Sequence, residues 1–224
     1  LTIPFVRERY LAHFKTIIEE WMDWGRVGPI VTNWDNLIRN EVQADNKKIY
    51  SFSDYTTNLY SDVNQGQTIF KGLQQYVDER RTYLLSLPEF NRPQPQLENL
   101  THTPQLPLAG QAVNVTVKAS APQGASLADI VLHYRDIGAF RGTPMFDDGQ
   151  HGDGAANDGI YGAFVQGSPA GTKIEYYVSS ACALSDGGAW SFIPNTAEFQ
   201  APSWTTQTGS STTPAFNEFL AKNN

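Results

Sequence analysis

The spacing of hydrophobic residues changes once along the chain. In residues 1–92 they recur at steps of three and four, whereas from residue 113 onward they recur at every second position. The first spacing places apolar side chains on one side of a helix, and the second places them on one face of a strand. The sequence therefore predicts a helical part followed by an all-β part.

The first part predicts four helices, over residues 4–24, 29–45, 53–62 and 68–87. Pro4 suits a first helical turn, Gly25 and Pro88 are stop signals, and Ser53 is a suitable cap for the third helix. Each helix has an apolar stripe, and the stripe of the second contains Ile30, Trp34, Leu37, Ile38 and Val42. Such stripes need one another for burial, so we expect one helical domain over residues 1–92.

Residues 88–107 contain five of the thirteen prolines. Proline fixes its own backbone and favours an extended conformation in the preceding residue. We expect a semi-rigid linker here that leads into a first edge strand.

Period-two runs then predict short strands over residues 113–118, 130–135, 159–165, 173–180 and 190–193, separated by Gly, Pro and Asp turns. This pattern is typical of an immunoglobulin- or fibronectin III-like β-sandwich, here over residues 93–202. The fold class is thus multi-domain, α then all-β. Tyr176 or Tyr177 would supply a tyrosine corner. Residues 203–224 begin Ser/Thr-rich, which predicts a linker and the truncated start of a further domain.

Charge is distributed unevenly between the two parts. Residues 1–92 carry 11 basic and 12 acidic side chains, whereas residues 93–224 carry 5 basic and 11 acidic ones. This acidic half lacks the basic stripe that nucleic-acid binding requires, so we expect no nucleic-acid partner. No apolar run is long enough for a transmembrane segment.

An acidic, glycine-rich string between two predicted strands is the clearest candidate for a metal site. Its oxygen-bearing side chains are Asp147, Asp148, Asp153, Asn157 and Asp158. Calcium takes six to eight oxygen ligands, and glycines let backbone carbonyls turn inward to supply some of them. The spacing does not match an EF-hand. Two hypotheses follow: a structural Ca²⁺ site that orders the loop, or a long hairpin loop built from the usual turn residues.

Other chemistry is sparse. We expect His151 to be an exposed loop residue, His133 to face solvent, and Cys182, the only cysteine, to be a small buried strand residue. No nucleophile elbow, zinc-protease, Walker or dinucleotide-binding motif occurs, which argues against a stand-alone hydrolase. The aromatic residues of the predicted sandwich are candidates for core packing or for a sugar-stacking surface; they are Tyr134, Tyr161, Tyr176, Tyr177, Trp190 and Trp204.

Three segments of the first part resemble the C-terminal end of the CotH (spore coat protein H-like) family of secreted and spore-coat proteins. They are residues 9–14 (RYLAHF), 38–48 (IRNEVQADNKK) and 77–86 (VDERRTYLLS). Residues 147–161 (DDGQHGDGAANDGIY) resemble a loop of Ig-like modules that follow such regions in bacterial surface proteins. Residues 216–224 (FNEFLAKNN) resemble the opening strand of a bacterial lamin-tail domain.

The CotH family is similar to atypical protein kinases. The resemblance implies that a nucleotide-binding lysine and metal-binding acidic residues would lie upstream of Leu1, and no position here matches them. It thus implies a non-catalytic C-terminal segment of an exported bacterial surface protein, with no catalytic residue of its own. Its partner would be the upstream kinase-like lobe, and the sandwich would act as spacer or attachment module. The alternative is a self-contained, secreted or cell-surface module that binds a polysaccharide or a protein.

Overall fold

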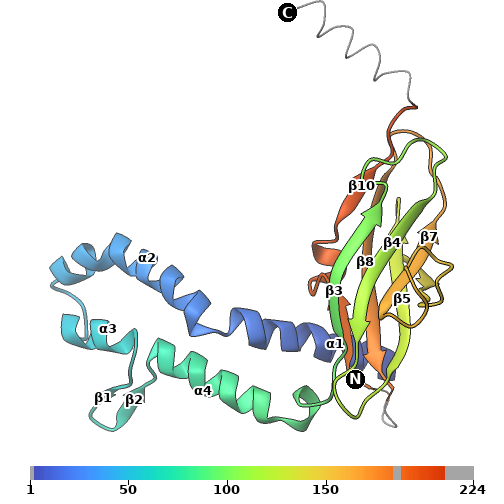
Figure 1. The fold of residues 1–224 in the computed structure, drawn as a ribbon. Helices are drawn as coiled ribbons and strands as arrows, with labels where there is room; N and C mark the ends of the chain where they lie inside the picture. Colours follow the sequence, from blue (N-terminus) through green and yellow to red (C-terminus); the bar gives the residue numbers. More distant parts are fainter. Residues whose placement is uncertain (1–2, 184–187, 210–224) are drawn as a thin grey trace, which may run out of the picture. The chain divides into compact units, whose positions relative to one another are not determined.

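The computed structural model describes residues 3–183 and 188–209 (Figure 1). The predicted lamin-tail segment, residues 216–224, lies outside them. The chain forms two compact units. Residues 13–92 are called here the helical unit, and residues 1–12 together with those from 93 on are called the sandwich unit. The first twelve residues, which the sequence assigned to the helical domain, therefore group with the strands.

The division between the units falls within α1, after Ala12, and the elements that follow α1 up to residue 90 belong to the helical unit. In chain order the elements of residues 4–90 are α1 (Pro4–Thr16), η1 (Ile17–Trp21), α2 (Trp24–Ala44), α3 (Phe52–Asn58), β1 (Val63–Gln65), β2 (Thr68–Phe70), α4 (Leu73–Ser86) and η2 (Pro88–Phe90). No helix among the described residues is long and apolar enough to cross a bilayer.

The predicted single helix over residues 4–24 is wrong, because the chain breaks at residues 22–23. The π-helical turn η1 ends there, and Asp23 has an extended backbone and caps α2, its Oδ1 accepting the Gly25 amide at 2.7 Å. Gly25 is thus the second residue of a new helix rather than a stop signal. A Cβ at Gly25 would lie 2.8 Å from Asp23 Oδ1, so a larger residue at this position would displace the capping carboxylate.

The predicted helix over residues 68–87 also begins too early. Residues 63–70 form a hairpin in which β1 and β2 pair antiparallel around Gly66, which has φ +63°. Only then does α4 begin, at Leu73. In the sequence, Gly66 is compatible with a hairpin turn. The apolar Ile69 fits the spacing of a helix as well as that of a strand, so it does not distinguish the two.

The third helix begins at residue 52, one residue earlier than predicted, because Ser51 rather than Ser53 caps it. The Ser51 hydroxyl accepts the Asp54 amide, and the Asp54 carboxylate accepts the Ser51 amide, a reciprocal capping box. The buried Asp35 of α2 accepts hydrogen bonds from Tyr55 Oη at 2.8 Å and from the Arg39 guanidinium. This network joins α3 to α2.

The sandwich unit contains eight strands within the described residues. They are β3 (Gln96–Thr103), β4 (Val113–Ser120), β5 (Leu127–Arg135), β6 (Arg141–Pro144), β7 (Ile160–Val165), β8 (Lys173–Cys182), β9 (Trp190–Ile193) and β10 (Ser203–Thr205), with the 3-10 turn η3 (Ala197–Phe199) before the last. One sheet has the order β3-β4-β7, and the other has the order β10-β8-β5-β6 with β9 also paired to β8. The first edge strand, β3, thus lies within the predicted linker.

The period-two pattern is confirmed by the core between these sheets. Val113, Val115 and Val117 of β4 are at most 2% exposed, and Ile130 and Leu132 face them from the other sheet within one apolar cluster. The predicted fold class, a helical part followed by an immunoglobulin-like β-sandwich, is confirmed.

Candidate functional site

All five predicted metal ligands lie in the loop between β6 and β7, and the carboxylates point at the loop's own amides. The buried Asp153 accepts hydrogen bonds from the amides of Asp148, Gly149 and His151, at 2.8, 2.8 and 2.9 Å. The Gly149 amide, together with the other two, holds the pKa of Asp153 below its ordinary value, despite the opposing effect of desolvation.

Two further aspartates close the base of the loop. Asp147 accepts the amides of Asp158 and Gly159 at 3.1 and 2.9 Å, and Asp158 accepts those of Ala155 and Ile160 at 3.2 and 2.9 Å. The remaining residue, Asn157, has φ +64°, the left-handed conformation that asparagine tolerates in turns. These contacts join the two ends of the loop where β7 begins.

Asp148 accepts the Gln150 amide at 2.9 Å and also pairs with His151. The histidine Nδ1 lies 2.9 Å from Asp148 Oδ1, and this hydrogen bond is the main cause that lowers the pKa of the Asp148 carboxyl. The His151 ring is also 4.7 Å from the ring of Phe146 and 6.4 Å from that of Phe164. Both phenylalanines are about half exposed. His151 is thus a partly covered loop residue close to two surface aromatics.

The loop carboxylates hold the hairpin together through hydrogen bonds to its own amides, a role that does not depend on a metal ion. Among the described residues, no group of three or more acidic, histidine or cysteine side chains converges so that it could hold a metal ion. Hydrogen bonds from amides relieve the repulsion between clustered carboxylates that otherwise calls for a cation. The calcium site stays a prediction, and we derive no function from it.

A second cluster, which the sequence did not predict, lies on the outer face of the β5–β8 sheet. The Arg9 guanidinium donates to Tyr177 Oη at 3.2 Å and pairs with Glu198. His133 stacks on the Tyr177 ring at 4.5 Å, and its Nε2 lies 2.8 Å from Ser179 Oγ. The prediction that His133 faces solvent is therefore wrong. Because α1 and η3 cover this face, β8 is buried on both sides over most of its length.

Burial changes the protonation of this cluster. Desolvation, assisted by the positive charge of Arg9, lowers the pKa of His133 to about 4.

Three of the aromatic residues considered for sugar stacking are core residues: Tyr176, Tyr177 and Trp204 are each less than 5% exposed. Tyr176 Oη forms a hydrogen bond with His102, and Tyr177 Oη accepts one from Arg9. Both hydroxyls therefore contact side chains, whereas the hydroxyl of a tyrosine corner bonds to the backbone. Cys182 is buried, as predicted.

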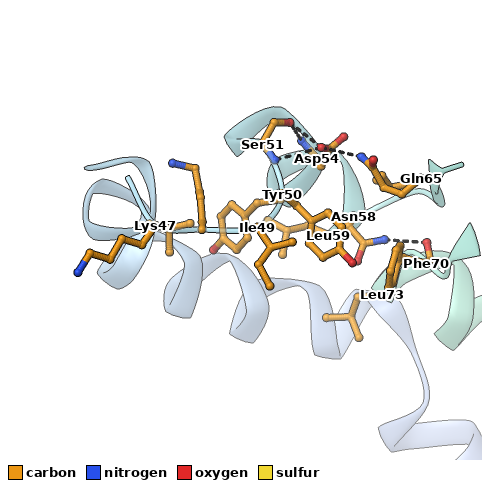
Figure 2. A pocket seen from close by; sticks show the side chains of 14 residues that line it. Lys47, Ile49, Tyr50, Ser51, Asp54, Asn58, Leu59, Gln65, Phe70 and Leu73 are labelled. Carbon is orange, nitrogen blue, oxygen red and sulfur yellow. Dashed lines mark hydrogen bonds between the residues drawn. The ribbon is translucent and has the colours of Figure 1, made fainter. Parts of the chain in front are cut away.

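The helical unit contains a cavity of about 710 Å³ between α2, the 46–51 segment, α3 and the β1–β2 hairpin (Figure 2). Its walls are mainly apolar and aromatic. The lining side chains include Val42, Ile49, Tyr50, Tyr55, Leu59, Val63, Phe70 and Leu73. Lys47 lies at one end (Figure 2), and the neighbouring Lys48 also lines the cavity. A cavity of this size and lining is of the kind that binds an apolar group, and no signal in the sequence pointed to it.

The comparisons bear on the sandwich unit. Residues 94–182 match the family described as "Conditioned medium factor 2nd Ig-like domain". The match begins just before β3, ends with β8, and agrees with the two packed antiparallel sheets.

Residues 94–182 form an Ig-like domain.

The acidic loop belongs to this Ig-like domain and connects its two sheets, since β6 lies in one and β7 in the other. The match covers about two fifths of the chain and leaves the helical unit outside it.

Two other comparisons add no argument. The search of curated proteins finds no match. Among solved structures, one similar chain is the Pseudomonas fluorescens alkylpurine DNA glycosylase AlkC bound to DNA containing an abasic site analog, at 12% identity and a TM-score of 0.29. That similarity covers 50% of this chain and 30% of the glycosylase chain.

Proposed function

We propose that this chain is the non-catalytic C-terminal segment of an exported, CotH-like, kinase-related bacterial surface protein. In this proposal the helical unit docks onto the kinase-like region of the parent protein. The Ig-like domain acts as a spacer or attachment module at the cell surface. The CotH resemblance of residues 9–14, 38–48 and 77–86 suggests the parent, and the surface of the helical unit supports the docking.

The observation that carries the proposal is the exposed part of the apolar stripe of α2, which consists of Ile30, Trp34, Leu37 and Ile38. The sequence pattern makes this the face to be buried, yet these side chains are 41%, 64%, 79% and 49% exposed. The fifth member, Val42, is partly buried and lines the cavity. The buried residues of α2 are instead Gly28, Val31 and Asp35. Soluble proteins rarely leave a contiguous stripe of large apolar residues in water unless another surface covers it.

The fourth helix has the same surplus of apolar surface. Only Val77 and Leu84 of α4 are buried, whereas Leu73, Tyr76 and Tyr83 are 40%, 53% and 55% exposed. By contrast, the Ig-like domain has a core of its own with many residues below 5% exposed. The proposal requires this contrast: a domain with a complete core of its own, joined to helices that leave apolar side chains for another surface to cover.

Substitution of Leu37 by glutamate tests the docking. In the 224-residue chain, Leu37→Glu replaces an exposed side chain, so we expect a change in unfolding free energy within about 0.5 kcal/mol. In the parent protein the same change buries a charge at an interface, and we expect a loss of about 2 kcal/mol or more. Thr32→Glu, at an exposed polar position of the same helix, is the control. Equal effects of Leu37→Glu in both chains would refute the proposal.

A second candidate function is binding of a polysaccharide or protein by the Ig-like domain itself. The half-exposed Phe146 and Phe164, on either side of His151, are the observation that favours it, because aromatic faces stack on sugars and anchor protein interfaces. We expect Phe146→Ala with Phe164→Ala to abolish retention on cell-wall polysaccharide without altering the melting temperature. Retention by the double variant equal to that of the unchanged chain would exclude this surface.

A further inference from the structure

The cavity of the helical unit, lined by residues of α2, the 46–51 segment, α3 and the hairpin, has apolar walls and one charged end (Figure 2). Asp54 is the acidic residue of its wall, and its carboxylate accepts hydrogen bonds from Ser51 and Gln65. Both donors are neutral, so the carboxylate keeps its charge, but the two lysines outnumber this one acid among the residues that line the cavity.

Lys47 and Lys48 make that end positive. The Lys48 amine donates to the backbone oxygens of Gln43 and Asp45, at 3.2 and 2.6 Å. Within the described part of the chain, no carboxylate lies within ion-pair distance of either lysine amine. An occupant that fills the apolar part and brings a negative charge to this end would complement both features.

The rim of the cavity decides between a small molecule and a polypeptide. Ile49 is 90% exposed, and Tyr50 and Leu73 are 45% and 40% exposed. A small ligand confined to the cavity would leave the Ile49 side chain in water. A polypeptide surface would cover it, as the rim of a binding pocket is covered in protein interfaces.

We propose that this cavity receives one or two large apolar side chains from a segment of the parent's kinase-like region, with an acidic residue of that segment facing Lys47 and Lys48. The inference rests on the proposed function and adds to it a position and a chemistry for the contact. It places a second anchor of the interface at the 46–51 segment, apart from the exposed part of the apolar stripe of α2.

Hydrogen exchange measured on the 224-residue chain and on the parent protein tests the inference. We expect the amides of residues 47–51 to exchange at least tenfold more slowly in the parent. If residues 30–38 gain protection and residues 47–51 do not, the inference fails while the proposed function stands. If neither segment gains protection, both fail.

Matched substitutions give a second readout. Ile49→Asp alters a side chain that is 90% exposed, so the 224-residue chain should keep its melting temperature, whereas the parent should lose the protection of residues 47–51. Ile137→Asp is the control, because Ile137 is 89% exposed in the Ig-like domain. In the parent, the double substitution Lys47→Glu with Lys48→Glu should reduce the protection of the amides of residues 47–51. Lys118→Glu is the charge control and should leave that protection unchanged. Equal protection in the Ile49 variant and the unchanged parent would overturn the inference.

Two other occupants are outcomes of the same experiment. Protection of residues 47–51 that rises with concentration in the 224-residue chain, together with a dimer in light scattering, would assign the cavity to a second copy. Saturable protection of the 224-residue chain by dodecanoate, but not by dodecanol, would assign it to a small apolar acid. Either result would overturn the inference.

Discussion

At the scale of single residues, the carboxylates of the acidic loop act as acceptors for the backbone. Asp153 alone satisfies three amides that the loop would otherwise leave without partners. Composition alone does not separate this use from calcium binding, because both need several oxygens and flexible glycines in a short span. The structure adds the direction of the side chains, which follows from the three-dimensional path of the loop and cannot be read from composition.

Removal of this acceptor should loosen the loop. We expect Asp153→Ala to lower the melting temperature of the sandwich unit by several degrees, since three loop amides lose the buried carboxylate that accepts them. Asp129→Ala, at an exposed position of β5, is the control and should have little effect. Thermal unfolding followed by circular dichroism measures both, and equal melting temperatures for the two variants would contradict the role given to Asp153.

The calcium hypothesis has a direct test. Because no three acidic, histidine or cysteine side chains converge among the described residues, we expect the same melting temperature in excess Ca²⁺ and in excess chelator. A rise with Ca²⁺ that disappears in Asp147→Asn would instead establish the metal site suggested by the sequence.

His133 predicts how stability changes with pH. Its pKa is about 4 in the folded protein, below the 6.5 of an exposed histidine, so the unfolded chain binds a proton first as pH falls. Stability should therefore be constant above pH 6.5 and decline between pH 6.5 and 4. In His133→Phe, which keeps an aromatic ring against Tyr177, this decline should be smaller. Parallel stability curves for the variant and the unchanged chain would contradict the assignment.

At the scale of elements, the sequence predicted the strands better than the helices. Val113, Val115 and Val117 alternate into a core that β4 shares with its neighbours, so a local pattern was enough. The helix boundaries depended on side-chain caps: Asp23 begins α2 and Ser51 begins α3, where apolar spacing alone pointed elsewhere. The cavity and the Arg9 cluster were not predictable, because each joins residues from several elements.

The Asp35 network is the main polar link between α2 and α3. Burial alone would raise the pKa of the Asp35 carboxyl, but the hydrogen bonds from Arg39 and Tyr55 outweigh it and lower the pKa. Asp35→Ala leaves the Tyr55 hydroxyl without its acceptor, and we expect a loss of about 1–3 kcal/mol in the stability of the helical unit. Asp45→Ala, at the exposed C-cap of the same helix, is the comparison in urea unfolding. Unchanged stability of the Asp35 variant would show that apolar packing alone holds α3.

At the scale of the whole molecule, the two units differ in how completely they bury their apolar residues. The Ig-like domain has a continuous core between two sheets. The helical unit leaves Trp34 and Leu37 mostly exposed, although their spacing is that of a buried helix face. Under the proposed function this difference has one cause: the Ig-like domain folds as a module, and the helices are completed by the rest of the parent protein.

Hydroxyl-radical footprinting of Trp34 and Leu37, in the 224-residue chain and in the parent protein, tests this account most directly. It reports the solvent exposure of these two side chains through their rate of oxidation and needs no substitution at either position. We predict that both react at least fivefold more slowly in the parent, while Ile137 of the Ig-like domain reacts equally in the two proteins. Equal reactivity of Trp34 and Leu37 in the two proteins would contradict the account.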